Sequence, residues 1–254
     1  MNDNLYISGV INTKLNNLLK ENDYDYLKKL NNEEIINYLN NICFIETFEI
    51  NDFKTLVNIY YDNLYKELLD YTNNRYYVDI FYINKLISII KIKNYKKNLI
   101  YKDINIYYQN FMKYQKQDNF TNELYLYLDN KINNKDISNY LDIIKIIINI
   151  KTYYRINKFN LNKDIFKKEL LSCSYNFNFD NFKDILKTKN EELFLILNNN
   201  FDDINKFNSK LDSYLDNYMF KKYEFSNDFI SLYLKYGYLK IKEIKKIEKI
   251  FYGV

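Results

Sequence analysis

The sequence predicts an all-α protein, and three features lead to that prediction. Apolar residues recur at intervals of three and four positions, the period of an α-helix, while strict alternation over the length of a strand is rare. The 254 residues include no Pro and only 3 Gly, so helix breakers are scarce. Polar residues stand where the apolar stripes begin. With 47% hydrophobic and 28% charged residues, the chain can bury a core.

The N-terminal stripe begins at Leu15, Leu18 and Leu19 and continues at Leu27 and Leu30. These positions share the helical period, so we expect helices from residue 15 onward.

The next helix has a start signal as well as a stripe. Asn31 and Asn32 are followed by Glu33 and Glu34, ahead of the apolar positions in 35–39. An Asn side chain can accept a free backbone amide at a helix start, and acidic residues suit the positive end of the helix dipole. Further helices are predicted from the same period over 53–70, 78–93, 123–130, 137–154, 163–171, 181–187, 191–199, 203–217 and 226–252.

Asparagine takes the place of glycine and proline between these helices. Asn runs occur at 72–74, 133–134 and 198–200. Asn tolerates left-handed backbone and bonds to its own main chain, so each run predicts a break. The apolar run 86–90 could pass for a strand, but the period and length of the segment around it favour a helix.

One apolar spacing, i, i+3, i+6 and i+7, occurs in three of the predicted helices. The copies are Ile83, Leu86, Ile89 and Ile90; Leu141, Ile144, Ile147 and Ile148; and Ile244, Ile247, Ile250 and Phe251. Such a stripe can arise by chance in an Ile-rich helical chain, but three copies are what three related bundles would produce. We expect the three helices to end near Lys93, Lys151 and Val254.

The composition excludes several kinds of active site. Without His there is no Ser-His-Asp or Cys-His catalysis and no imidazole metal ligand. Three scattered glycines cannot form a phosphate-binding loop. Cys43 and Cys173 are interpreted as free thiols, which suits a reducing compartment. Most missing residue types use G/C-rich codons while the 42 Asn use A/T-rich ones, so the bias indicates an AT-rich genome more than a function.

Neither a leader nor a membrane span is predicted. Residues 1–19 lack the basic segment and uninterrupted apolar run of a signal peptide. The most apolar stretch, 143–150, is short and contains Lys145 and Asn149, whereas a spanning helix needs roughly 20 apolar residues. We therefore expect a soluble chain.

Two other patterns have both a functional and a structural interpretation. The acidic pairs at 33–34, 191–192 and 202–203 could bind metal or act as general acids, but adjacent helical side chains point about 100° apart and all three pairs stand at helix starts. Capping or solvated faces are therefore favoured. The mixture of Tyr107, Tyr108, Lys113 and Tyr114 could stack on single-stranded nucleic acid. Because the chain contains 29 Tyr, packing is the favoured role.

The end of the chain carries a pattern that identifies a possible family. Its residues are Tyr236, Lys240, Glu243, Ile244, Ile247, Ile250 and Gly253, with Lys245 in a basic position. This pattern resembles the closing signature of the C/d family of central-stalk subunits in V/A-type rotary ATPases (V-type ATP synthases), whose eukaryotic members are the d-type subunits. Lys246 stands where the family has Asn.

Two further regions follow the order of the same family. The N-terminal matches are Tyr6, Gly9, Lys14, Leu18, Leu19, Tyr26, Leu27, Leu30, Glu34, Ile35 and Leu39. The internal matches are Asp79, Asn84 and Lys93, and then Asp142, Lys145 and Lys151. The segment 161–174 resembles the stretch that follows the second internal copy, with Ser172, Cys173 and Ser174 near the place of the family's Gly-Gly.

The resemblance implies one family domain over 1–254, made of helical repeats at approximately 1–97, 98–155 and 156–254. Three bundles would form a funnel with pseudo-threefold symmetry, the middle one shortened. The implied function is a non-catalytic central-stalk protein that couples the rotor shaft to the membrane rotor ring and passes torque between ATP hydrolysis or synthesis and proton or sodium transport. Such a protein is cytoplasmic, lies against the membrane as part of its complex, and needs no cofactor or metal.

Two alternatives remain open from the residues alone. The chain can be a lineage-specific helical scaffold or protein-interaction module. It can also bind nucleic acid, although the net charge of +4 is spread along the chain and nucleic-acid binders concentrate theirs on one face. Of these two, the scaffold is favoured.

Overall fold

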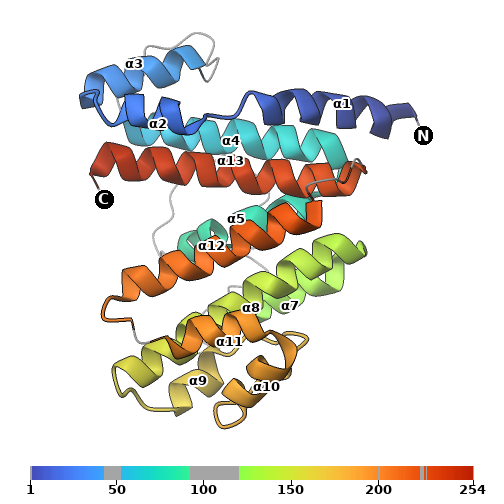
Figure 1. The fold of residues 1–254 in the computed structure, drawn as a ribbon. Coiled ribbons are helices and arrows are strands. Elements are labelled where there is room, and N and C mark those ends of the chain that lie inside the picture. Colours follow the sequence, from blue (N-terminus) through green and yellow to red (C-terminus); the bar gives the residue numbers. More distant parts are fainter. Residues whose placement is uncertain are drawn as a thin grey trace. The chain divides into compact units, whose positions relative to one another are not determined.

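The computed structural model describes residues 2–42, 53–91, 120–199, 201–223, 226 and 228–253. In this part of the chain there are twelve α-helices and no strand, which confirms the all-α prediction (Figure 1). Their bounds are α1 (Asn2–Asn16), α2 (Glu21–Leu27), α3 (Asn32–Ile42), α4 (Phe53–Thr72), α5 (Arg75–Lys91), α7 (Phe120–Lys131), α8 (Lys135–Lys158), α9 (Asp164–Glu169), α10 (Phe182–Lys189), α11 (Glu191–Asn198), α12 (Ile204–Tyr223) and α13 (Phe229–Tyr252). Among these helices, none combines the length and the apolar character that crossing a membrane requires.

The chain divides into two compact units. Unit 1 comprises Met1–Phe81 and Ser226–Val254, and unit 2 comprises Tyr82–Phe225. Unit 1 therefore brings the two ends of the sequence together. The expected division into three related bundles stays a prediction, because the two units are defined by packing and not by internal similarity.

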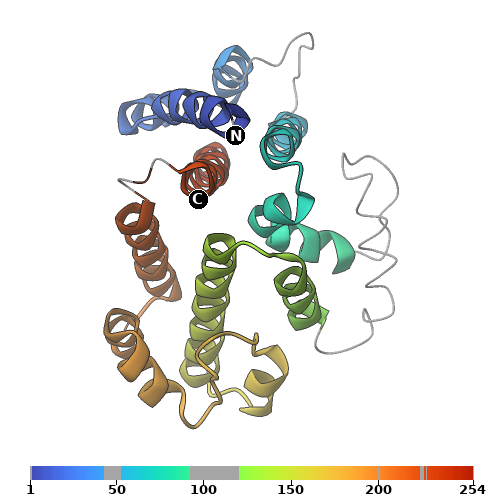
Figure 2. The same cartoon turned by 90° about the vertical axis from the view of Figure 1, so that its right-hand side faces the viewer.

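Helix α13 is the central element of unit 1. It contacts α1, α2 and α4, and Figure 2 shows α13 and α4 nearly end-on with α1 beside them. The Asp228 carboxylate caps its start by accepting the Ser231 amide at 3.0 Å. Gly253, at φ +68°, ends it in the left-handed conformation that a residue with a Cβ adopts at a cost. Within the stripe, Ile244 and Ile247 are buried.

Unit 2 is built around α8, which is buried on most of its surface. Its side chains pack with aromatic residues of α9, α10 and α12; Tyr153, for example, stacks on Phe182 with ring centroids 4.3 Å apart. Asn149 is fully buried, and its side-chain amide exchanges two 2.8 Å hydrogen bonds with the backbone of Leu171. These bonds satisfy the backbone N–H and C=O of Leu171 in the loop after α9. The two backbone groups would otherwise be buried without a partner, which explains a polar side chain in the core.

Asparagine does supply the predicted breaks. Asn134 caps α8 by accepting the amides of Asp136 and Ile137. Asn73, Asn160 and Asn176 all have positive φ, the role that glycine commonly fills.

The helix bounds agree with the expected ones within a few residues at most ends, but two expectations are wrong. The stripe expected from Leu15 is interrupted, because α1 runs from Asn2 to Asn16 and Leu18 and Leu19 lie in the turn before α2. In that turn the Asp23 carboxylate accepts the Lys20 amide at 2.7 Å and starts a new helix. The second repeated helix does not end near Lys151, because α8 continues to Lys158. Lys93 and Val254 lie outside the described residues.

The α13 stripe allows a matched test of packing. Ile247 is 3% exposed, whereas Ile250 on the same face is only partly buried. We expect Ile247→Asp to lower the free energy of unfolding by about 3–5 kcal/mol, because the carboxylate would be buried without a partner. Ile250→Asp should cost about 1 kcal/mol. Urea denaturation followed by circular dichroism measures both, and equal small effects would contradict the packing of α13.

Candidate functional site

Unit 1 contains a partly buried polar cluster, and its three members on α13 belong to the closing signature of the sequence. We define the polar cluster by its side chains, which are Lys14 of α1, Tyr60, Glu67 and Tyr71 of α4, and Tyr236, Lys240 and Glu243 of α13. Two carboxylates, Glu243 and Glu67, each collect several donors.

Glu243 connects three segments of unit 1. Its side chain is 4% exposed. One oxygen, Oε1, accepts hydrogen bonds from the Lys240 ammonium at 2.6 Å and the Tyr60 hydroxyl at 2.7 Å. The other, Oε2, accepts the backbone amide of Leu19 at 2.8 Å. A carboxylate on α13 therefore holds the turn between α1 and α2.

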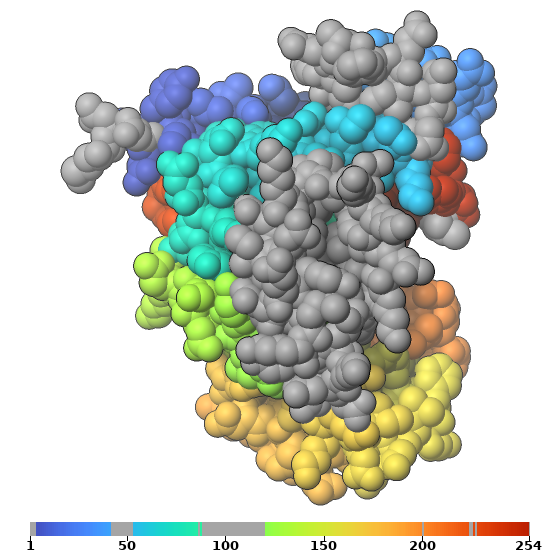
Figure 3. Space-filling view, turned by 180° about the vertical axis from the view of Figure 1, so that it is seen from behind, coloured from blue at the N-terminus to red at the C-terminus, as the bar shows by residue number. Residues whose placement is uncertain are grey.

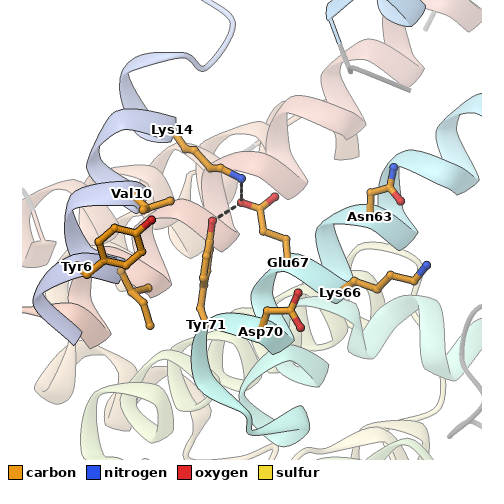
Figure 4. A pocket seen from close by; sticks show the side chains of 9 residues that line it. Tyr6, Val10, Lys14, Asn63, Lys66, Glu67, Asp70 and Tyr71 are labelled. Atoms are coloured by element: carbon orange, nitrogen blue, oxygen red, sulfur yellow. Dashed lines mark hydrogen bonds and ion pairs between the residues drawn. The ribbon is translucent and has the colours of Figure 1, made fainter. Parts of the chain in front are cut away.

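Glu67 is the second junction. Its Oε1 accepts the Lys14 ammonium at 2.6 Å, the Tyr71 hydroxyl at 2.6 Å and the Tyr236 hydroxyl at 2.9 Å. Figure 4 shows Lys14 and Tyr71 converging on Glu67 from α1 and α4. One carboxylate oxygen thus joins α1, α4 and α13.

The two tyrosines on Glu67 are held as hydrogen-bond donors. Burial, and then the negative charge of Glu67, raise the pKa of the Tyr236 hydroxyl far above its usual value of about 10. Burial and the hydrogen bond to Glu67 raise the pKa of Tyr71 in the same way. Both hydroxyls stay protonated at neutral pH, so each can donate a hydrogen bond to the Glu67 carboxylate.

The cluster has the chemistry of a structural clamp. Its acidic groups are engaged by ammonium, hydroxyl and amide donors at hydrogen-bond distance, which fixes their positions. In the described part of the chain, no group of three or more Cys, Asp or Glu residues is placed to hold a metal ion.

A groove with a volume of about 550 Å³ lies beside the cluster, between α1 and α4. Figure 3 shows these two helices, in blue and cyan, as neighbours on one face of unit 1. Tyr6, Ile7 and Val10 line the groove from α1, and Lys66, Glu67 and Asp70 line it from α4. Tyr6 is 75% exposed, so the groove is open along its rim.

The structure brings together residues that carry the resemblance at the two ends of the sequence. Tyr236, Lys240 and Glu243 lie in the cluster with Lys14, and Leu19 contributes its amide. The other residues that carry the resemblance have different roles. Leu27, Ile35 and Leu39 are buried, Glu34 caps α3 through Asn31, Ile250 is partly buried, Gly253 ends α13, and Tyr6, Gly9 and Tyr26 are exposed.

The internal matches lie apart from the cluster. Asp79 is 1% exposed and accepts the Tyr65 hydroxyl at 2.9 Å. In unit 2, Lys145 is 4% exposed and pairs with Asp129 at 2.7 Å and with Asp142 at 3.7 Å. Lys151 pairs with Asp212 at 3.2 Å. These residues hold neighbouring helices together within each unit.

The acidic pairs confirm the capping interpretation. Glu34 and Asn31 cap each other's backbone amides at the start of α3. Glu191 and Glu192 lie in the first turn of α11, and Asp203 accepts the amide of Asn205 at the start of α12. Burial raises the pKa of the Cys173 thiol, so it favours the neutral form. Cys43 and the Tyr-Lys stretch 107–114 lie outside the described residues.

Sequence reasoning missed the α4 side of the cluster. Tyr60, Glu67 and Tyr71 are seven and then four residues apart, which places them along one side of a helix. That spacing was the available signal, but in a chain with 29 Tyr it does not stand out until α13 is packed against it.

The raised tyrosine pKa values make unit 1 sensitive to alkali. A folded-state pKa above the unfolded value contributes stability below the unfolded pKa of about 10, and this contribution is lost as the pH rises beyond it. We expect helix content to fall cooperatively above pH 10, with tyrosinate absorbance appearing in the same transition. Gradual ionisation of nearly all tyrosines near pH 10 with unchanged helix content would contradict the burial of these hydroxyls.

Comparison with known proteins gives no match to a family model, to a curated protein or to a solved structure. What points to a function in this chain is therefore the contacts of the polar cluster and the groove beside it, together with the residues of the signature.

Proposed function

We propose that this chain is a non-catalytic helical protein that couples the rotor shaft of a V/A-type ATPase to its membrane rotor ring. One observation carries the proposal: residues that carry the resemblance at opposite ends of the sequence meet at the same two carboxylates. Lys14 and Tyr236 both donate to Glu67, and Leu19 donates to Glu243. Residues that carry the resemblance are therefore joined in space, as expected if they act as a unit.

A coupling protein has to resist twisting, and the cluster supports that role. Hydrogen bonds to charged groups are directional, and breaking one at the buried Glu243 carboxylate would leave that charge without a partner, at a cost of several kcal/mol. Sliding α13 along α4 would break the hydrogen bonds of Tyr236 to Glu67 and of Tyr60 to Glu243 at once. The apolar residues of α13 add packing on the same side, including Ile244 and Ile247.

The proposal includes the partners and location that the resemblance implies. The shaft and the ring are the expected partners, and the protein would lie on the cytoplasmic face of the membrane as part of the complex. Lysines dispersed over its surface can approach anionic lipids and the cytoplasmic face of the ring.

A helical scaffold is the second candidate, and the groove favours it. The exposed Tyr6 of α1 lines an open groove together with Ile7 and Val10, and exposed apolar surface in a groove is typical of protein-binding sites. This candidate requires no rotary ATPase.

Purification of the tagged full-length chain from its native host separates the two candidates. We expect it to carry the shaft, the ring and the ATP-hydrolysing components, each identified by mass spectrometry in constant ratio. We also expect that depleting the chain leaves ATP hydrolysis unable to drive ion transport across membrane vesicles. The control is a strain that expresses the tag alone. Recovery of the chain without these components, with transport intact after depletion, would contradict the rotary proposal.

A further inference from the structure

We infer that the groove between α1 and α4 binds an amphipathic helix of a partner protein. This inference goes beyond the proposed function, because it holds for a rotary coupling protein and for a scaffold alike. It rests on the extent of the groove along two helices, on the difference between its two walls, and on two charged side chains at its rim.

The lining of the groove extends along both helices for about two turns. Its walls are two helices that both pack against α13. The lining runs from Tyr6 to Lys14 on one wall and from Asn63 to Tyr71 on the other. Eight residues of helix span about 12 Å, so each wall offers slightly more than two turns. Side chains of an added helix could pack between these rows as they do in helical bundles.

The two walls differ in polarity, and the difference defines the occupant. Tyr6, Ile7 and Val10 make most of the α1 wall apolar, and Lys14 at its end is bound to Glu67. The α4 wall presents Lys66 and Asp70, both exposed. An apolar stripe on the occupant would cover the first wall, and charged residues beside that stripe would face the second.

The charges of the α4 wall determine the order of acidic and basic residues on the bound helix. Glu67, at the base of the groove, is already bound by Lys14, Tyr71 and Tyr236 and calls for no further charge. In the described part of the chain, the side chains of Lys66 and Asp70 make no ion pair or hydrogen bond. They lie one helical turn apart, so a helix with an acidic residue one turn from a basic residue can pair with both.

Other kinds of occupant fit less well. An anionic membrane surface or a nucleic acid attracts a wall with an excess of basic residues. Besides the ion pair of Lys14 and Glu67, the groove is lined by one cation and one anion, which suits a protein segment that presents both charges.

The test selects helix-forming peptides from a displayed library against the full-length chain. We expect enriched peptides with an apolar stripe and with one acidic and one basic residue a turn apart. The variant Tyr6→Ser should weaken their binding roughly tenfold or more, because it removes a large contact from the apolar wall. Tyr6 is 75% exposed, so this variant should fold normally. The matched control is Tyr26→Ser on α2, also exposed and outside the groove, which should leave the affinity unchanged.

A charge reversal makes the test independent of any single variant. Selection against the double variant Lys66→Glu, Asp70→Lys should enrich peptides with the order of acid and base exchanged. The inference is overturned if no helical peptide is enriched, or if binding is insensitive to both Tyr6→Ser and the charge reversal. It is also overturned if sedimentation shows self-association that Tyr6→Ser abolishes, because the occupant is then a second copy. Binding to anionic vesicles that Tyr6→Ser abolishes would likewise overturn it in favour of a membrane.

Discussion

The buried carboxylate of Glu243 is the constraint on which unit 1 depends. A negative charge that is 4% exposed has to be neutralised and hydrogen-bonded. Its donors come from α13 itself, from α4 and from the turn after α1. These segments are far apart in the sequence, so satisfying one side chain brings the two ends of the chain together. Glu67 repeats the arrangement with Lys14, Tyr71 and Tyr236.

The groove follows from the same packing. Because α13 holds α1 and α4 on its surface, these two helices approach each other at Lys14 and Glu67 and leave a groove beside that pair. A rigid clamp next to an open groove is a combination that suits a coupling protein as well as a scaffold. The proposed coupling role uses the clamp, and the inferred helix-binding site uses the groove.

The helical fold could be predicted because apolar period and Asn caps are local signals. Helices such as α8 and α13 and the burial of Ile244 and Ile247 follow directly from them. The extent of α1 could not be predicted, since its polar and apolar residues give no clear stripe. The hydrogen bond from Leu19 to Glu243 could not be predicted either, because its donor is a backbone amide, which every residue except proline has. The tyrosines of α4 could not be singled out either, because the chain contains 29 Tyr.

Amide hydrogen exchange at Leu19 tests the central claim most directly. Leu19 lies outside any helix, so its amide would exchange quickly unless the Glu243 carboxylate binds it. We expect protection comparable to that of the amides of α13, and we expect Glu243→Gln to reduce it while the neighbouring helices stay folded. Exchange of the Leu19 amide at the rate of an exposed turn, with α13 protected, would show that α13 does not hold the N-terminal segment through this carboxylate.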